Sequence, residues 1–210
     1  MYQAILFDID GVIIRPDKYY SSFLENNGFP GALKSIDAFY KQDISCIIGI
    51  ENPLVSVEKY LKDFNWNKSA ESYFIEQYKY ESEFIDYVLL NKIFKLRNKD
   101  ILCFLATDQN HHRKDYILKE WKFNEYFNDH FVSANIGYRK INNEYWEYVV
   151  RNLKKRGIFQ ENKTLFIDDR IENIKKAKEF GFNTFHVSHK ESINELYEII
   201  EKISLTTAST

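Results

Sequence analysis

The chain has 210 residues, 44% of them hydrophobic and 29% charged, which suits one α/β domain with or without a small inserted module and excludes two full domains. A formal net charge of -2 gives no long-range attraction to polyanions, so nucleic acid is not an expected partner. The apolar runs are far shorter than the ~20 residues that span a bilayer, and no basic segment followed by an apolar stretch opens the chain, which argues against a membrane partner and a targeting signal.

The two cysteines, Cys46 and Cys103, lie in apolar surroundings and form no Cys-x-x-Cys pair. This pattern favours buried free thiols in a reducing compartment. We therefore expect a soluble, cytoplasmic protein. No feature of the sequence predicts an oligomeric state.

The first predicted strand covers residues 4–7, an apolar run that ends abruptly at Asp8. Four further runs of this kind lie at residues 101–106, 131–133, 164–167 and 184–187. Helical patterns separate the later strands at residues 112–121, 143–155 and 171–180. Buried strands alternating with helices predict an α/β fold, a doubly wound parallel sheet of Rossmann-like type with right-handed crossovers.

The segment between the first two predicted strands is too long for a simple crossover, because about 90 residues separate them. Within it, helical patterns occur at residues 19–26, 36–44, 55–64 and 70–80, and residues 85–96 read as a core helix that leads into the second strand. We therefore predict an α/β core formed by residues 1–15 and 84–204, a small inserted helical cap over residues 16–83, and a flexible tail over residues 205–210.

Polar side chains follow several of the predicted strands at the point where each strand ends. Asp8 and Asp10 follow the first strand, Thr107 follows the second, and Asp168 and Asp169 follow the fourth. The carboxyl ends of parallel strands line the ligand crevice of an open α/β sheet, so we expect these groups to converge. Clustered carboxylates need a counter-charge, and oxygen ligands on a partly open site favour Mg²⁺ over zinc.

These residues resemble the four motifs of the haloacid dehalogenase (HAD) superfamily, and the phosphatase-type members of subfamily I that carry a helical cap. The four segments are Asp8-Ile9-Asp10-Gly11-Val12, Leu105-Ala106-Thr107-Asp108, Lys140 within Gly137-Tyr138-Arg139-Lys140, and Phe166-Ile167-Asp168-Asp169 followed by Asn173 and Ala177. The resemblance implies a HAD-like core and a phosphatase that acts on a small phosphate ester.

The resemblance also implies a role for each of four catalytic residues. Asp8 would attack phosphorus and form an aspartyl-phosphate. Asp10 would protonate the leaving oxygen and then activate water, which requires surroundings that raise its pKa. Thr107 and Lys140 would hold the phosphoryl oxygens.

A Mg²⁺ cofactor is implied as well, and its ligands would come from motifs one and four. They would be Asp8, the backbone carbonyl of Asp10, and Asp169. Asp168 would be either a further ligand or the partner of Lys140. Dehalogenases of the superfamily lack an aspartate at the position of Asp10 and need no metal, so its presence favours phosphoryl chemistry.

Two alternatives to a phosphatase stay open at this point. A phosphomutase resembling β-phosphoglucomutase would return the phosphoryl group to a sugar, but such a relative usually has a His-containing hinge where this chain has Arg15-Pro16-Asp17-Lys18-Tyr19-Tyr20. A catalytically silent HAD-like binding module is the other alternative. Its hints are Asp108, where the family often has Asn, and the unusual residues 141–143 after Lys140.

Overall fold

The computed structural model describes residues 2–206, and within this range five parallel strands form one sheet. Their spatial order is β3 (Asp129–Val132), β2 (Leu102–Thr107), β1 (Ala4–Phe7), β4 (Thr164–Asp168) and β5 (Asn183–His186). The five predicted strands are confirmed with slightly shifted ends. Strand order reverses at β1, which is the position where open α/β sheets bind ligands.

One shifted strand end has a clear cause in side-chain hydrogen bonding. Ser133 is predicted to close the third strand, but it opens the short helix α9 (Ser133–Ile136). Its hydroxyl donates to the carbonyl of Ile47 (2.7 Å) and accepts from the N–H of Gln109 (2.9 Å). These bonds turn the chain away from the sheet.

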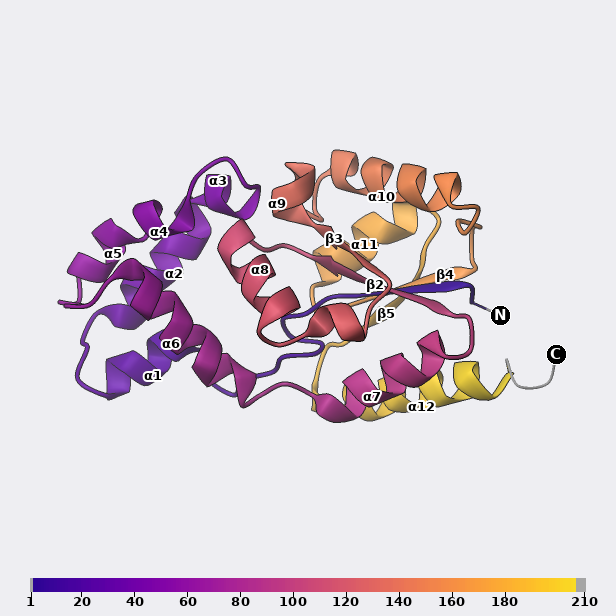
Figure 1. The fold of residues 1–210 in the computed structure, drawn as a ribbon, viewed down its shortest axis with the longest axis horizontal. Helices are drawn as coiled ribbons and strands as arrows, with labels where there is room; N and C mark the ends of the chain where they lie inside the picture. Colours follow the sequence, from indigo (N-terminus) through magenta and orange to yellow (C-terminus); the bar gives the residue numbers. More distant parts are fainter. Residues whose placement is uncertain (1, 207–210) are drawn as a thin grey trace.

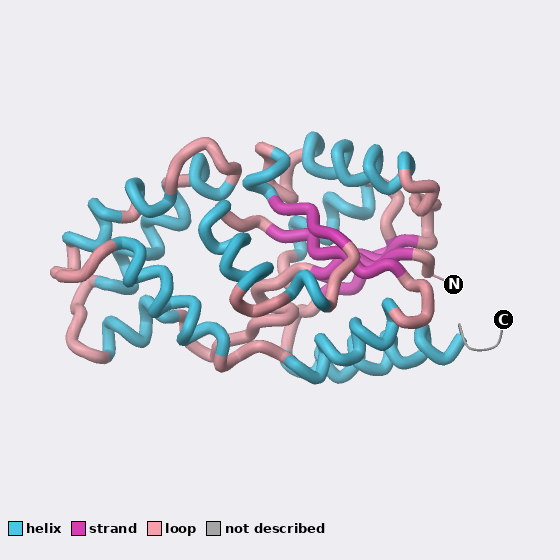
Figure 2. Tube along the Cα trace, in the orientation of Figure 1, coloured by secondary structure: helices cyan, strands magenta, loops and turns pink. Residues whose placement is uncertain are grey.

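Helices cover both faces of the sheet, as Figures 1 and 2 show. On one face, α7 (Tyr87–Arg97) and α12 (Lys190–Thr206) lie side by side, while α10 (Asn143–Lys155) and α11 (Ile171–Glu179) cover the other. Because both faces are covered, all four residues of β1 are fully buried. The doubly wound α/β fold class is therefore confirmed.

The remaining helices follow β1 and β2. After β2 come α8 (His111–Lys119) and the 3-10 turn η1 (Phe123–Glu125). Between β1 and α7 lie α1 (Tyr20–Asn26), α2 (Ala32–Gln42), α3 (Ile44–Ile47), α4 (Pro53–Ser56), α5 (Glu58–Lys62) and α6 (Ala70–Ser82). The helix predicted over 55–64 is thus two short helices, and the first begins early because Pro53 occupies its first position and the side chain of Asn52 caps it.

The helical segment between β1 and α7 has an aromatic core of its own, separate from the two apolar clusters on the faces of the sheet. Its linkers meet at an isolated antiparallel bridge between Ile14 and Ile85. The N–H of Asp86 donates to the carbonyl of Ile13 (2.8 Å) beside this bridge. The pairing brackets the segment that we call the cap, residues 16–83.

The cap also packs against α8 of the core. The hydroxyl of Tyr78 is hydrogen-bonded to Nδ1 of His112 (3.0 Å), and the ring of Tyr78 lies 4.9 Å from that of Tyr116. Trp121 contacts the same aromatic cluster. The cap therefore rests on the core through α8 as well as through its linkers.

The C-terminal segment differs from the prediction. Helix α12 runs through Leu205 and Thr206, so these two residues are helical rather than part of the predicted flexible tail, and residues 207–210 lie outside the described range. Ile193, Leu196 and Ile200 fix the helix because they are buried in the apolar cluster under the sheet. Within residues 2–206, no helix combines the length and the apolar character needed to cross a membrane.

Candidate active site

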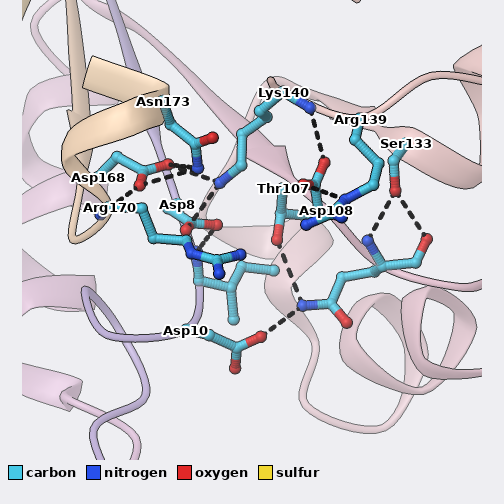
Figure 3. A network of polar contacts seen from close by, with 12 residues as sticks. Asp8, Asp10, Thr107, Asp108, Ser133, Arg139, Lys140, Asp168, Arg170 and Asn173 are labelled. Atoms are coloured by element: carbon cyan, nitrogen blue, oxygen red, sulfur yellow. Dashed lines mark hydrogen bonds and ion pairs between the residues drawn. The ribbon is translucent and has the colours of Figure 1, made fainter. Parts of the chain in front are cut away.

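Three neighbouring strands deliver polar residues to one edge of the sheet (Figure 3). Thr107 and Asp168 are the last residues of β2 and β4, and Asp8 directly follows β1. Phe7 pairs with Leu105 on one side and Ile167 on the other, so the three strands end at nearly the same level. The convergence predicted from strand ends is therefore present in the fold.

Lys140 lies between two buried carboxylates at this edge. Its Nζ is 2.7 Å from Oδ2 of Asp8 and 2.6 Å from Oδ2 of Asp168. All three side chains are nearly inaccessible to solvent. Burial acts to lower the pKa of Lys140, but the charges of Asp168 and Asp8 outweigh it and hold the pKa above its ordinary value. Lys140 is therefore a fixed cation rather than a solvated surface lysine.

Asp8 experiences the opposite balance. Burial raises its pKa well above the ordinary value, Lys140 counteracts this in part, and the charge of Asp168 adds to the rise. Two buried carboxylates thus share one ammonium group. A further cation near Asp8 is the simplest means of keeping this carboxylate ionised.

Asp168 is held from several directions. Besides the ion pair with Lys140, its Oδ1 accepts from the N–H of Arg170 (2.8 Å) and from Nδ2 of Asn173 (3.1 Å). These bonds come from the start of α11, which follows the strand directly. Asp168 therefore orients Lys140.

Asp169 faces the loop that follows β1. A Cβ atom on Gly11 would lie 2.4 Å from the carboxyl carbon of Asp169, and the φ of Gly11 is +76°, so both space and backbone require glycine there. Burial and the charge of Asp168 raise the pKa of Asp169 to about 6. Single oxygens of Asp8, Asp168 and Asp169 lie within 4.8 Å of one another, a donor set that fits a hard divalent cation.

Asp108 is neutralised by its surroundings. Its carboxylate accepts from the N–H of Lys140 (2.9 Å) and forms an ion pair with Nε of Arg139 (3.2 Å). The N–H of Arg139 in turn donates to the side chain of Asn142 (3.1 Å). Asp108 therefore braces the loop that carries Lys140, instead of adding an uncompensated charge to the pocket.

Asp10 lies on the cap side of the edge, in contact with α8. Nη1 and Nη2 of Arg113 are 2.6 and 2.7 Å from its two oxygens, and Nε2 of Gln109 is 2.6 Å away. Burial acts to raise its pKa, but the side chain is 47% exposed, and Arg113 with Gln109 lowers the pKa below its ordinary value. The contacts of Asp10 thus shift its pKa in the direction opposite to the one that the implied acid–base role requires.

Three residues of this network were not predicted from the sequence: Gln109, Arg113 and Glu81. They line or adjoin a cavity of about 550 Å³ between cap and core, which Asp8, Thr107 and Lys140 also line. Gln109 and Arg113 precede and open the helix after β2, and a helix that starts at a strand end faces the crevice. That position was the available signal, whereas Glu81 depends on the fold of the cap.

Comparisons with known proteins agree with this geometry. The family model of the haloacid dehalogenase-like hydrolases matches residues 2–181. The chain belongs to this family. The search of curated proteins found no match to this chain.

Solved structures of HAD proteins share the fold. A HAD family enzyme from Bacteroides thetaiotaomicron, in complex with magnesium and inorganic phosphate, is 20% identical over 89% of this chain and 94% of its own, with a TM-score of 0.69. A HAD-like family hydrolase from Porphyromonas gingivalis is 17% identical over 95% and 98%, with a TM-score of 0.69. The L-2-haloacid dehalogenase from Xanthobacter autotrophicus is 11% identical over 99% and 88%, with a TM-score of 0.63. At these identities the likeness concerns the fold.

Proposed function

We propose that this HAD-like hydrolase is a Mg²⁺-dependent phosphatase that hydrolyses a small phosphorylated metabolite through an aspartyl-phosphate on Asp8. The observation that carries the proposal is the position of Asp8 in contact with the fixed cation of Lys140 and beside Asp168 and Asp169. A buried carboxylate beside a cation suits nucleophilic attack on an anionic phosphoryl group. Thr107, at the end of β2, would hold a second phosphoryl oxygen.

In the first step, an oxygen of Asp8 forms a bond to phosphorus while the bond from phosphorus to the ester oxygen breaks. Asp10 gives its proton to the leaving oxygen. In the second step a water oxygen attacks phosphorus, Asp10 takes its proton, and Asp8 is released. A dianionic phosphoryl group beside Asp10 would raise its pKa and so oppose the lowering effect of Arg113.

We assign the Mg²⁺ ligands to Asp8, Asp169 and the backbone carbonyl of Asp10, with Asp168 as a further ligand. Because Asp168 already binds Lys140, Arg170 and Asn173, its main role would be to orient Lys140. When bound, the ion would neutralise charge that develops on the phosphoryl oxygens. The magnesium and phosphate in the enzyme from Bacteroides thetaiotaomicron support this assignment.

The other reactions considered have less support. The dehalogenase from Xanthobacter shares the fold, but the second motif-one aspartate, Asp10, favours phosphoryl chemistry. No contact of the described residues favours a mutase over a hydrolase. A catalytically silent binding module is disfavoured, because the charge of Asp108 is paired with Arg139 and does not add to the negative charge of the pocket. The cap over residues 16–83 would supply substrate selectivity, since Tyr40 and Gln77 line the cavity.

A phosphatase screen tests the proposal. Purified protein is incubated with a panel of phosphorylated metabolites and with 4-nitrophenyl phosphate, in Mg²⁺ and in excess EDTA. Release of inorganic phosphate that depends on Mg²⁺ is the expected result. Product analysis of any sugar phosphate would reveal a mutase as an isomer without phosphate release. No turnover of any ester, or full turnover in EDTA, would contradict the proposed function.

A further inference from the structure

The guanidinium of Arg113 lies at the junction of core and cap. It comes from the first turn of α8 and is 7% exposed. Its two terminal nitrogens contact the two oxygens of Asp10 at 2.6 and 2.7 Å, a bidentate pair. The same Nη2 atom lies 2.9 Å from Oε2 of Glu81, near the end of cap helix α6. Arg113 thus joins a motif-one aspartate to the cap.

Glu81 is itself anchored inside the cap. Its Oε1 accepts from Nε2 of Gln77 (2.8 Å), and the Gln77 amide is also hydrogen-bonded to the hydroxyl of Tyr40 in α2 (3.0 Å). Both Glu81 and Gln77 are buried. A continuous chain of polar contacts therefore runs from α2 through α6 to Asp10, along the wall of the cavity.

We propose that Arg113 is a positioning residue that fixes the carboxyl group of Asp10 at the reaction site and ties its position to the cap through Glu81. The inference rests on the proposed function, because it gives Asp10 its role as acid and base. Two parallel N–H···O bonds fix both the position and the plane of a carboxylate, which a single ammonium nitrogen cannot do. Glu81 holds the same guanidinium through its contact with Nη2.

The placement of Asp10 allows this role. Its side chain is 47% exposed although its oxygens are bonded, so one side remains open to the cavity. Misplacing a catalytic group by about 1 Å costs roughly 10²-fold in rate. That loss falls on proton transfer to the leaving oxygen, so it should be large for an ester with a poor leaving group and small for one that leaves without a proton.

Two aryl phosphates of similar shape provide the test: phenyl phosphate, with a poor leaving group, and 4-nitrophenyl phosphate, with a good one. The variants are Arg113→Lys and Glu81→Gln, with Glu76→Gln on the same helix as the control, since Glu76 pairs with Lys68 instead. The value of kcat/KM is measured for each ester in Mg²⁺, because it reports the phosphorylation step. Melting temperatures check that each variant folds.

We expect Arg113→Lys to lower kcat/KM by about 10²-fold for phenyl phosphate and less than tenfold for 4-nitrophenyl phosphate. Glu81→Gln should shift the ratio in the same direction by a smaller factor, and Glu76→Gln should leave it unchanged. If Arg113→Lys does not fold, Glu81→Gln decides, because it keeps the shape of the side chain.

Equal losses on both esters, or a gain in activity, would mean that Arg113 only holds the cap, and would overturn the inference while the proposed function stands. Wild-type protein without Mg²⁺-dependent turnover of either ester would overturn the proposed function, and this inference with it.

Discussion

The carboxyl edge of the sheet and the cap both bury polar groups, but different contacts hold them. At the edge, Lys140 forms ion pairs of 2.7 and 2.6 Å with Asp8 and Asp168. The register of β1 and β4 places the two carboxylates, and Asp108, which directly follows β2, holds the loop that carries Lys140. The cap is mostly a cluster of packed aromatic rings with neutral hydrogen bonds such as the one between Tyr40 and Gln77, and its buried carboxylate Glu81 pairs with Arg113 of the core. The carboxylates at the strand ends have fixed positions, which suits catalysis. The side-chain contacts of the cap can be changed by substitution without moving those carboxylates.

The largest expected effect is that of Asp8→Asn, which removes the proposed nucleophile from the edge. Turnover should fall by roughly 10⁴-fold or more, and no phosphoenzyme should form. Because one ammonium now serves one carboxylate, the metal-free variant should melt no lower than wild type. Intact-mass measurement after addition of an activated phosphoryl donor checks labelling, with Asp10→Asn as the control that still accepts the group. Undiminished labelling of the Asp8 variant would place the nucleophile elsewhere.

Lys140→Met leaves Asp8 and Asp168 buried without their shared cation. Breaking a buried pair by removing one partner costs about 3–5 kcal/mol, so the free energy of unfolding should fall by about this amount without metal. Mg²⁺ should restore part of the loss if it binds the same carboxylates. Urea denaturation with and without Mg²⁺ measures both effects. An unchanged free energy of unfolding would show that the ion pairs of Lys140 do not stabilise the fold.

The pKa of Asp169 predicts how metal binding depends on pH. Folding raises the pKa of Asp169 from 3.8 to about 6, so proton binding to Asp169 stabilises the folded protein. This stabilisation is complete below pH 3.8 and is lost as the pH rises through about 6. Mg²⁺ competes with that proton. The rise in melting temperature caused by Mg²⁺ should therefore increase between pH 5 and pH 7, and Asp169→Asn should weaken this dependence, since Asp8 is left as a ligand with a raised pKa. A Mg²⁺ effect that is equal at both pH values would contradict the assignment of Asp169 as a ligand.

The smallest effect is expected in the cap. Tyr78→Phe removes one partly buried hydrogen bond to His112 and keeps the ring, so the free energy of unfolding should fall by about 1 kcal/mol. Hydrolysis of 4-nitrophenyl phosphate should not change. Chemical denaturation and kinetics on one preparation measure the two quantities. A large loss of activity would show that this part of the cap acts on the edge directly.

The carboxylates and the hydroxyl of the edge were predictable from the sequence because each follows a short apolar run, whereas Lys140 was assigned only through the family resemblance. Asp8, Thr107 and Asp168 needed only the assumption of a parallel sheet to be placed together. The cap contributes through contacts between distant residues. Helical periodicity places Glu81 on the buried face of α6 together with Phe74, Gln77 and Tyr78. Its partner Arg113 lies 32 positions away, so only the packing of the cap on α8 shows which charge Glu81 meets.

The pKa of Asp10 could not be predicted from the sequence for the same reason. The acid–base role that the resemblance implies requires a raised pKa. The fold brings Gln109 and Arg113, which follow β2, into contact with Asp10, and these contacts lower its pKa. The electrostatics of a site depend on every element that packs against it, including those that carry no motif.

The bridge between Ile14 and Ile85 makes the cap a natural graft point for protein engineering. Because the two linkers leave the core side by side, a foreign module with adjacent ends can be inserted there without altering the strand order of the sheet. The graft must also cover Tyr116 of α8 and Trp121 just beyond its end, which pack against the native cap. Chimeras designed with this second surface in mind would exchange selectivity between HAD proteins while keeping one catalytic edge.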